Sequence, residues 1–387
     1  MPLPADQVQL LLGGRVVDGG VLGGQVHADW ESYEIDSDLL TPADAWHLTL
    51  GFASGEEVGA KLVNGLPPEV CAGAPVSVKV GAETVLTGRI DEVSHRVDRR
   101  GHTLSLSGRD GAAVLVDCSA AVFVARLVSL DEVMAKVVAP LGITRMRVDA
   151  AATRRREKVN VEPGDTAWEV LVHAAEANGL WPWFDPDGTL VVGGPDYLHP
   201  PVADLILRHS GQGNNVLAMD LRRSVAERFS EVTVLGQTHG TALESGKHAL
   251  RASAVDEEMK ALAYRPKIVV DHEADDSELA RKRARKLISD ARLRGLTLSA
   301  TVRGHRIVAP GEASHGRLWM PGQRVRVCSD PHGLEAIFFV MGRKFSGGRA
   351  AGARTELTLK EDGMWTLDAH PHKLRYRSRV VDGIVDQ

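Results

Sequence analysis

Few groups of residues in this sequence have the types and the spacing of a catalytic site. His272 and Glu273 begin the HExxH pattern of a zinc-binding helix, but Asp276 stands where the second histidine belongs. The segment 211–215 (GQGNN) resembles a nucleotide-binding loop, but Val216 replaces its third glycine, and we interpret the segment as a turn. The sequence contains neither a P-loop nor a GxSxG nucleophile motif. Residue types therefore give no positive indication of catalysis.

The spacing of acids, histidines and cysteines does not favour a metal site either. Asp185 and Asp187 lack the further oxygen ligands of a calcium loop, so we interpret DPDG as a hairpin turn. His370 and His372 have one nearby carboxylate, Asp368, whereas a metal site needs three or four convergent ligands. The cysteines are Cys71, Cys118 and Cys328. An odd number without a CxxC pair is typical of reduced thiols in the cytosol. We assign no catalytic, cofactor-binding or metal-binding residue.

Composition narrows the class of protein. The chain has 387 residues, of which 43% are hydrophobic and 25% charged, as in a soluble globular protein. This length corresponds to roughly two to four folding units. A net charge of −5 argues against a protein whose main function is to bind nucleic acid. The N-terminal segment MPLPADQVQLLLGG has neither the pattern of a signal peptide nor that of a membrane anchor. We therefore expect no membrane span.

Alternating apolar and polar residues predict strands in the first part of the chain. The clearest segments are 76–80, 84–93 and 102–108, and residues 98–101 (DRRG) are typical of a hairpin turn between the last two. Short strands at this spacing favour a small barrel or sandwich. A similar alternation returns after Gly295, in LTLSATVRG, QRVRV, EAIFFVMGRKF and ELTLK. The two halves do not align well enough to define an internal repeat.

The middle of the chain has a mixed pattern. We predict a helix that is capped by Ser129 and ends near Pro140, because acids follow the serine and glycine follows the proline. A second helix is predicted at 165–177, followed by a hairpin at 181–192. The polar segment 239–256 is predicted to be a loop.

The strongest helical pattern covers residues 275–294 and carries the densest basic run. Its apolar stripe consists of Leu279, Ala280, Ala284, Leu287, Ile288 and Ala291. The basic residues are Arg281, Lys282, Arg283, Arg285 and Lys286. This run is either a solvated face opposite the stripe or a binding surface for an anionic partner, such as DNA or an acidic protein. We predict a structural helix that packs its apolar stripe on the second β domain.

These patterns together predict a β-rich α+β protein with two β-barrel-like domains, a small α/β insertion and one long basic helix. The first β-barrel-like domain covers residues 1–118 and is completed by 204–240, which contain a predicted strand at 230–236. Residues 119–203 form the α/β insertion, and 241–387 contain the helix and the second β-barrel-like domain.

One segment of the insertion resembles a known glycan-binding repeat. Residues 161–170 (VEPGDTAWEV) resemble the opening of a LysM peptidoglycan-binding unit, in which a turn and a capped helix carry an aromatic anchor. After Gly179, however, the chain enters a Trp-rich hairpin and not the second helix and strand of a LysM unit. A peptidoglycan-binding or cell-wall-acting tail protein that uses residues 161–192 is the alternative to the function described next.

Several segments follow one another in a fixed order: TVLTGRIDEV, SGRDGAAVLVDCSA, SLDEVMAKVVAPLGI, PGDTAWEVLVHAAEANGLWPWFDPDGTLVV, VTVLGQ, LWMPGQRVRV and EAIFFVMGRKFS. This order resembles that of the baseplate hub proteins of contractile-tailed bacteriophages. The resemblance is to the phage Mu type and to the related late control D tail proteins, and it covers roughly residues 75–360. It depends on the order and spacing of these segments, because each one alone is ordinary strand and turn sequence.

This resemblance implies a homotrimeric ring at the distal end of the tail tube, in which each subunit contributes two similar β-barrels. It implies contacts with the tail tube protein, the central spike protein and other baseplate proteins. DNA would pass through the channel without specific binding, and neither an active site nor a cofactor would be needed. The expected location is the virion, in the tail baseplate, after assembly in the host cytoplasm. Homologous hubs also occur in phage-derived bacteriocins and secretion machines.

Overall fold

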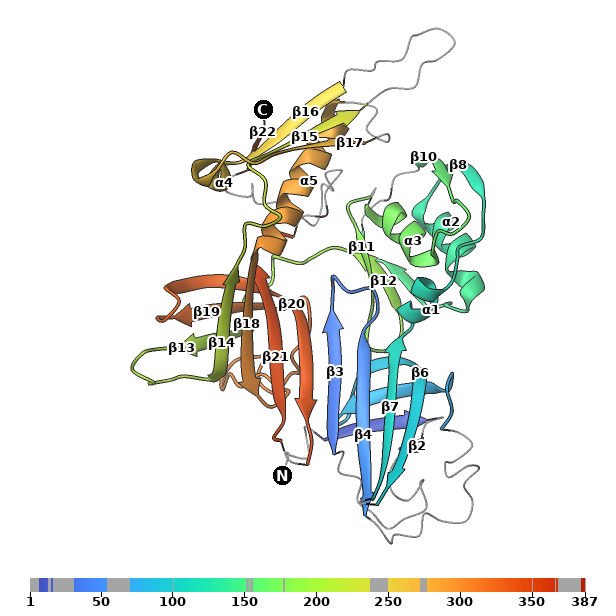
Figure 1. The fold of residues 1–387 in the computed structure, drawn as a ribbon, viewed down its shortest axis with the longest axis vertical. Helices are drawn as coiled ribbons and strands as arrows, with labels where there is room; N and C mark the ends of the chain where they lie inside the picture. Colours follow the sequence, from blue (N-terminus) through green and yellow to red (C-terminus); the bar gives the residue numbers. More distant parts are fainter. Residues whose placement is uncertain are drawn as a thin grey trace.

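The computed structural model is a β-rich protein in which one large sheet is accompanied by three smaller ones (Figure 1). Two β regions lie side by side in the lower half of Figure 1. An α/β insertion and a four-stranded sheet lie above them, and the long helix α5 (Ser277–Gly295) packs against the four-stranded sheet. The structure describes residues 7–12, 15–16, 31–53, 70–99, 101–150, 153, 156–176, 178–236, 250–271, 277–349, 351–365, 367 and 384–386.

The N-terminal β region consists of strands in which buried and exposed residues alternate. Its main strands are β3 (Ser32–Asp38), β4 (Ala45–Ala53), β5 (Pro75–Val80), β6 (Glu83–Asp98) and β7 (Gly101–Asp110). They pair antiparallel in the order β3-β4-β7-β6-β5, and β1 (Val8–Leu12) and β2 (Arg15–Val16) extend the sheet beyond β5. This confirms the three predicted strands and the hairpin between the last two.

The C-terminal β region repeats this topology. Its main strands are β14 (Val216–Arg223), β18 (Leu296–Arg303), β19 (Arg324–Ser329), β20 (Leu334–Gly347) and β21 (Arg354–Glu361). Their order is β14-β18-β21-β20-β19, which matches β3-β4-β7-β6-β5 strand for strand, and β13 (Ala203–Leu207) is added beyond β19. The register also shifts at the same place, after Ile90 in β6 and after Val340 in β20. The two regions are therefore two copies of one arrangement.

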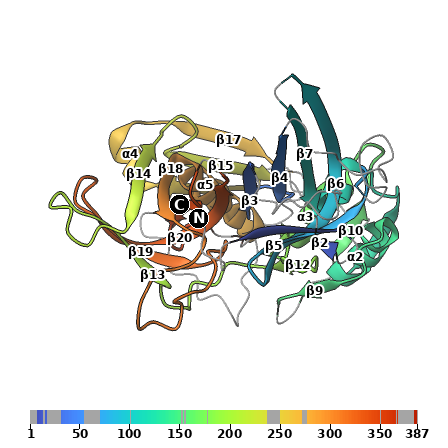
Figure 2. The same ribbon diagram turned by 90° about the horizontal axis from the view of Figure 1, so that it is seen from below.

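Strand β20 joins the two regions into one sheet. Its residues 334–339 pair with β19, whereas residues 342–347 pair antiparallel with β3. As a result, β14-β18-β21-β20-β3-β4-β7-β6 form eight consecutive strands of the large thirteen-stranded sheet, and we call these eight strands the wall. One hydrophobic cluster extends behind the wall across both regions, from Val8 to Leu359. Figure 2 shows β14, β4 and β7 in the upper part of the view and β13, β19 and β5 below them.

The insertion between β7 and β13 is a small α/β unit with a hydrophobic cluster of its own. Its elements are α1 (Ala112–Asp117), β8 (Val124–Val128), α2 (Leu130–Val137), η2 (Ala139–Leu141), β9 (Met146–Val148), β10 (Arg156–Asn160), α3 (Ala167–Glu176), β11 (Trp181–Phe184) and β12 (Leu190–Gly193). The Ser129 hydroxyl accepts from the Glu132 N–H at 3.2 Å, and the Glu132 carboxylate accepts from the Ser129 N–H, which completes a capping box. Both predicted helices and the hairpin are confirmed.

Helix α5 belongs to a separate unit with a four-stranded sheet. This unit contains β15 (Glu231–Gly236), β16 (Leu250–Asp256), α4 (Glu257–Leu262), β17 (Pro266–Val270) and β22 (Ile384–Asp386), with the strand order β17-β15-β16-β22. Ala280, Ala284 and Ile288 of α5 share a hydrophobic cluster with residues of β15 and β16. The expectation that this helix packs its stripe on the second β domain is therefore wrong. The helix instead continues without a loop into β18.

Residues 204–240 do not complete the first β region, contrary to expectation. Strand β13 pairs with β19 and β14 with β18, whereas β15 pairs with β16 and β17. The physical reason is that Val232 and Val234 find their apolar partner in α5, and strand alternation cannot specify such a partner. The predicted loop at 239–256 is wrong for residues 250–256, which form β16, and its residues 239–249 lie outside the described residues.

The β-rich class is confirmed, but the barrel-like description needs correction. None of the sheets that the described strands form closes on itself. Closure does not occur because the long strands β6 and β20 extend past the strands β5 and β19 that pair with their first halves. The second half of β20 then continues the sheet into the neighbouring region.

Candidate functional site

The wall has an apolar face and a polar face. Along its strands, alternate side chains enter the hydrophobic cluster and the residues between them point outward. Across β18, β21, β20, β3, β4, β7 and β6, one row of outward residues consists of Arg303, Arg354, Ser346, Glu34, His47, Ser107 and Glu92. The next row begins with Thr301, Glu356, Lys344 and Asp36. The outward face therefore mixes short hydroxyl side chains with charges of both signs.

Opposite charges are paired on this polar face. Lys344 Nζ lies 2.7 Å from Glu34 Oε2, so this ion pair links β20 to β3. Arg109 Nε lies 2.6 Å from Asp91 Oδ2 near the other end of the wall. Tight binding of DNA requires clustered Lys and Arg against the phosphates, and this face intersperses them with acids. Among the described residues, no group of three or more His, Cys, Asp and Glu could hold a metal ion.

The two β regions meet where β20 pairs with β3, and we call this junction the seam. His305 lies behind the wall at the seam. Its Nε2 lies 2.8 Å from Tyr33 Oη, and its Nδ1 lies 3.2 Å from Thr355 Oγ1. Its ring is 4.5 Å from the Phe345 ring, centroid to centroid. Burial lowers the pKa of His305 to about 3, and two neighbouring arginines act in the same direction. His305 is therefore a neutral, buried member of the shared core.

Arginine side chains of the C-terminal region also reach across the seam. Arg343 is buried and donates to the carbonyl oxygens of Ile35 at 3.3 Å and Val85 at 3.4 Å. Burial lowers the pKa of its guanidinium to about 10. Arg306 Nη1 donates to Glu83 Oε1 at 2.5 Å. These contacts hold the two halves of the wall in one fixed arrangement.

Two carboxyl groups with raised pKa values lie where the wall meets the insertion. Burial raises the pKa of Asp44 to about 6. The pKa of Asp110 is also raised well above its usual range, first by burial and then by the Asp44 charge. Asp44 Oδ1 accepts the Asp38 N–H at 3.2 Å, and Asp110 Oδ1 accepts the Ala112 N–H at 2.9 Å. These hydrogen bonds give both acids a structural role at the start of β4 and of α1.

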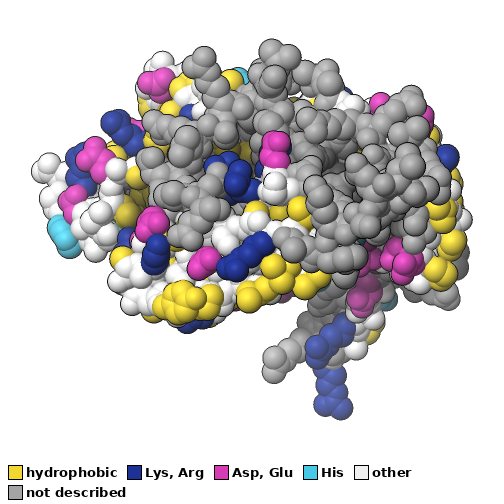
Figure 3. Space-filling model, turned by 90° about the horizontal axis from the view of Figure 1, so that it is seen from above, with side chains coloured by type: hydrophobic (Ala, Val, Ile, Leu, Met, Phe, Trp, Pro, Cys, Tyr) yellow, Lys and Arg dark blue, Asp and Glu magenta, His cyan; other side chains and the backbone are white. Residues whose placement is uncertain are grey.

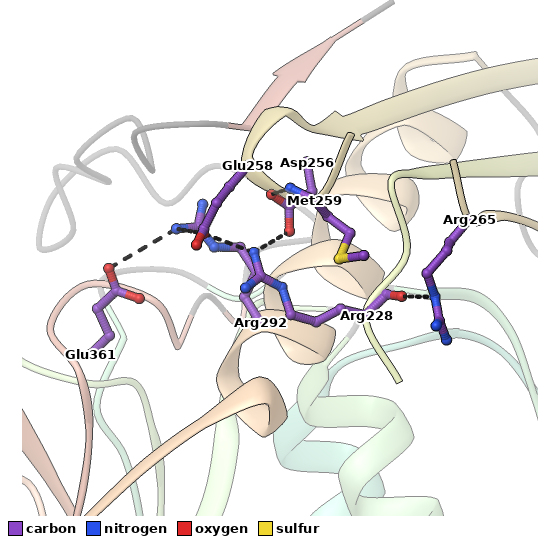
Figure 4. Close-up of polar contacts among 7 residues, drawn as sticks. All are labelled: Arg228, Asp256, Glu258, Met259, Arg265, Arg292 and Glu361. Carbon is purple, nitrogen blue, oxygen red and sulfur yellow. Dashed lines mark hydrogen bonds and ion pairs between the residues drawn. The ribbon is translucent and has the colours of Figure 1, made fainter. Parts of the chain in front are cut away.

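Arg228 lies at the centre of a polar junction below the four-stranded sheet (Figure 4). Its Nη2 donates to Asp256 Oδ2 at 2.8 Å and to Glu258 Oε2 at 2.9 Å. Asp256 is buried and also caps α4, because its Oδ1 accepts the Met259 N–H at 3.2 Å. Arg265 donates to the carbonyl oxygen of Arg228 at 3.2 Å. The hydrogen bond from Arg228 lowers the pKa of Glu258.

Arg292 extends this junction to the wall. Its Nη2 lies 3.8 Å from Glu258 Oε2 and 4.0 Å from Glu361 Oε1, at the end of β21 (Figure 4). Lys360 Nζ donates at 2.8 Å to the carbonyl oxygen of Leu293, near the point where α5 becomes β18. The four-stranded unit is therefore anchored to the wall through charged contacts at the C-terminal end of α5.

The basic run on α5 is not uniformly solvated. Arg281 and Arg285 are exposed, but Lys286 is only 6% exposed. Lys286 Nζ lies 2.8 Å from Asp290 Oδ2 and 3.2 Å from Glu176 Oε1, which belongs to α3. This run therefore contributes a contact between α5 and the insertion. Figure 1 shows α5 above the wall, so the run does not belong to the polar face.

Exposed apolar side chains gather along α4 and β17. Leu262, Tyr264, Ile268 and Val270 are exposed by 67%, 75%, 68% and 60%. Among the described strands, β17 pairs only with β15, so it forms an edge of its sheet. Seen from above, hydrophobic side chains form a band along this edge of the molecule (Figure 3). An apolar patch beside a sheet edge is typical of a protein-binding surface.

The two predicted turns are confirmed. Residues 211–215 connect β13 to β14, and Asn214 Oδ1 accepts the Arg208 N–H at 2.7 Å. In the β11–β12 hairpin, the Gly188 N–H donates to the carbonyl oxygen of Asp185 at 2.8 Å. Gly188 has a φ of +83°, which explains why glycine stands there.

Some of the remaining predicted positions lie outside the described residues and others lie inside them. Outside the described residues lie His272, Glu273, Asp276, Asp368, His370 and His372. Cys71 is exposed, and Cys118 and Cys328 are half-buried free thiols. Trp168, the aromatic residue of the LysM-like segment, is 6% exposed and packs in the core of the insertion. This segment therefore presents no aromatic anchor to a glycan at that position.

Sequence analysis missed the residues of the seam. Tyr33 lies in a part of the chain to which no strand was assigned, and His305 lies just after one. Arg343 offered a signal, because it falls two residues before Phe345 and therefore shares the inward side of a predicted strand. A charged residue at an inward position indicates a buried partner, and here that partner is the backbone of the other β region.

Family models match successive parts of the chain. Residues 21–110 match "Mu phage baseplate assembly protein GpP-like, N-terminal", and 112–194 match "Baseplate hub protein gp44-like, second domain". Residues 228–288 match "Tail protein NMB1110-like, third domain", and 290–364 match "Tail protein, C-terminal domain". These descriptions name tail and baseplate components and no enzyme.

Whole-chain comparisons agree with these models. A tail protein from Neisseria meningitidis MC58 is 38% identical, with a TM-score of 0.77 over 94% of this chain and 99% of that one. The 43 kDa tail protein of prophage MuSo2 from Shewanella oneidensis is 25% identical, with a TM-score of 0.75 over 92% and 98%. Baseplate hub protein gp44 of Escherichia phage Mu is 22% identical over 331 residues, which are 83% of this chain and 81% of that one.

The fold is that of a phage tail protein. The chain belongs to the family of Mu-type baseplate hub and tail proteins, which confirms the family expected from the order of its segments.

Proposed function

We propose that this protein is the structural hub of a contractile-tail baseplate, in which three copies form a closed ring that joins the tail tube to the central spike. The wall is the main observation that supports this proposal, because one chain contains two copies of the same strand arrangement side by side. Three such chains present six similar units, which suits a hexameric tail tube. A closed ring uses heterologous contacts, and the two different ends of the wall provide the two surfaces.

In this proposal the polar face of the wall lines the channel through which DNA passes. Its mixed charges support passage without specific binding, because they provide no continuous basic track for the phosphates. The basic run on α5 lies outside that face. No catalytic activity or cofactor is required for such a role.

Other baseplate proteins would bind to surfaces outside the wall. The exposed apolar patch along α4 and β17 is suited to binding the tail tube protein, the spike or another baseplate component. The proposed location is the tail baseplate of the virion, after assembly in the host cytoplasm. Among the described residues, no helix has the length and apolar character needed to cross a membrane.

Light scattering coupled to size exclusion tests the ring. We expect a trimer at micromolar concentration and, by electron microscopy, a ring with an open centre. A monomer under these conditions would overturn the proposal. Incubation of the full chain with purified peptidoglycan tests the alternative, and we expect no retention of the protein by the insoluble glycan.

A further inference from the structure

Strand β9 of the insertion has one paired edge and one open edge. The strand order is β11-β12-β9, so among the described strands β9 pairs with β12 alone, and Figure 2 shows it at the lower margin of the insertion. The Asp149 N–H donates to the carbonyl oxygen of Val192 at 2.8 Å, on the paired side. Because successive residues of a strand direct their backbone groups to opposite edges, the N–H and C=O groups of Met146 and Val148 face the open edge. Such an edge can pair with a further strand.

A groove of about 570 Å³ lies between this strand and helix α2. Its apolar side chains belong to the hydrophobic cluster of the insertion or pack against it. Two of them are methionines, whose flexible thioether side chains adapt to apolar partners of different shapes. The residues that line the groove are Asp131, Met134, Met146, Val148, Ala150 and Thr153.

The charge that faces this groove is negative. Asp131 lies one turn before Met134 on α2, is exposed, and has no ion-pair partner among the described residues. The nearest basic residue on β9 is already paired, since Arg147 lies 3.2 Å from Asp149 and 3.1 Å from Asp185. A ligand with a basic side chain close to Asp131 would therefore be attracted to the groove.

We propose that this groove binds an extended peptide segment of another protein. The segment adds a strand to the open edge of β9, places alternate apolar side chains between β9 and α2, and brings a lysine or arginine to Asp131. Backbone hydrogen bonds provide affinity for an extended chain, whereas the apolar groove and Asp131 select its sequence. An apolar small molecule would fill the groove but leave the strand edge unpaired, so the observations favour a peptide.

Selection from a displayed library of random twelve-residue peptides on the immobilised full chain tests the specificity. We expect enriched peptides to alternate apolar and polar residues and to carry a lysine or arginine beside the apolar series. In the variant Asp131→Lys, glutamate or aspartate should replace that basic residue. The matched control is Glu312→Lys, which changes an exposed acid of the C-terminal β region and should enrich the same peptides as the original protein. Absence of enrichment, or an enriched set that Asp131→Lys does not alter, would overturn the proposal.

Backbone methylation of an enriched peptide tests the added strand. The N–H groups of alternate residues face the same edge, so methylation of one alternate set should weaken binding at least about 10-fold, as measured by fluorescence anisotropy. Methylation of the other set should change the dissociation constant by less than about threefold. Equal effects of the two sets, large or small, would overturn the pairing with β9.

Val148→Pro provides the corresponding change in the protein. It removes a backbone donor from the open edge, a position at which an edge strand tolerates proline. We expect peptide binding to weaken roughly 10-fold, and unchanged binding would contradict the proposed strand.

These tests are independent of the ring proposed above. A trimer that enriches no peptides would overturn the peptide groove and leave the hub function standing. A monomer that binds the enriched peptides would overturn the ring and leave the groove standing.

Discussion

Tyr33 and His305 are 272 residues apart in the sequence, yet Tyr33 Oη and His305 Nε2 lie 2.8 Å apart behind the wall. Their rings meet edge to face with centroids 5.7 Å apart. This contact joins β3, in the N-terminal β region, to the loop after β18, in the C-terminal β region. Because burial lowers the pKa of His305 and keeps its imidazole neutral, protonation of this group at acid pH should destabilise both β regions.

In the variant His305→Asn, the free energy of unfolding should fall less steeply as the pH is lowered. The folded pKa of about 3 lies below the unfolded value of 6.5, so the stability contributed by neutral His305 is complete above pH 6.5 and is lost as pH falls towards 3. In this window the free energy of unfolding should fall by about 1.4 kcal/mol per pH unit from this group. Urea denaturation between pH 7 and pH 4 measures the slope. The exposed-site variant His209→Asn should keep the original slope, and an unchanged slope in His305→Asn would contradict the assignment.

Asp44→Asn should stabilise the protein at neutral pH. The folded pKa of about 6 lies above the usual value of 3.8, so the stability linked to the protonated carboxyl is complete below pH 3.8 and is lost as pH rises through 6. Asparagine keeps an oxygen acceptor for the Asp38 N–H without the buried charge. We expect a gain of up to about 3 kcal/mol at pH 7 that shrinks towards pH 4. Thermal unfolding at both values checks this, and a variant that is less stable at pH 7 would refute it.

Ile288→Ala should cost more stability than Leu287→Ala. Ile288 is 1% exposed in the cluster between α5 and the four-stranded sheet, whereas Leu287 is half-buried at its margin. Truncation of a buried isoleucine typically costs about 2–5 kcal/mol, and we expect less than about 2 kcal/mol for Leu287. Chemical denaturation of the two variants gives the comparison. Equal losses would mean that the helix presents a different face to the sheet.

Local sequence patterns predicted the elements but not their long-range partners. Alternation in 84–93 and 102–108 was sufficient for β6 and β7, because the side of a strand to which a residue points is a local property. The pairing of β20 with β3 joins residues 342–347 to 33–38, and no local pattern specifies such a partner. The seam and the continuity of the wall were therefore beyond sequence analysis.

The internal repeat was hidden for a related reason. Equivalent inward positions carry different residues, with Arg343 in β20 where β6 has Val93, and Phe345 where β6 has His95. The two β regions share the strand order, the alternation of inward and outward positions and the position of the bulge, but they do not share residue types. The second half of β20 pairs with β3, whereas among the described strands the second half of β6 pairs with β7 alone, so the two positions have different surroundings.

Lys286→Met should destabilise the protein through the contact between α5 and the insertion. Burial opposes the charge of Lys286, but the carboxylates of Asp290 and Glu176 outweigh it and raise the pKa of the lysine. Removing one partner of a buried ion pair leaves the others poorly compensated, at a cost of about 3–5 kcal/mol in fully buried cases. Asp290 and Glu176 have side-chain exposures of 23% and 24%, so water can partly replace the lysine and we expect about 1–3 kcal/mol.

Arg281→Met is the matched control for this prediction, because Arg281 is an exposed basic residue of the same run on α5. Its loss should change the free energy of unfolding by no more than about 0.5 kcal/mol. Urea denaturation of both variants at low and high salt measures the difference, which should persist in salt because a buried pair is screened less than an exposed one. If the two variants lose equal stability, the basic run is a solvated face along its whole length, and α5 is held to the insertion by other contacts.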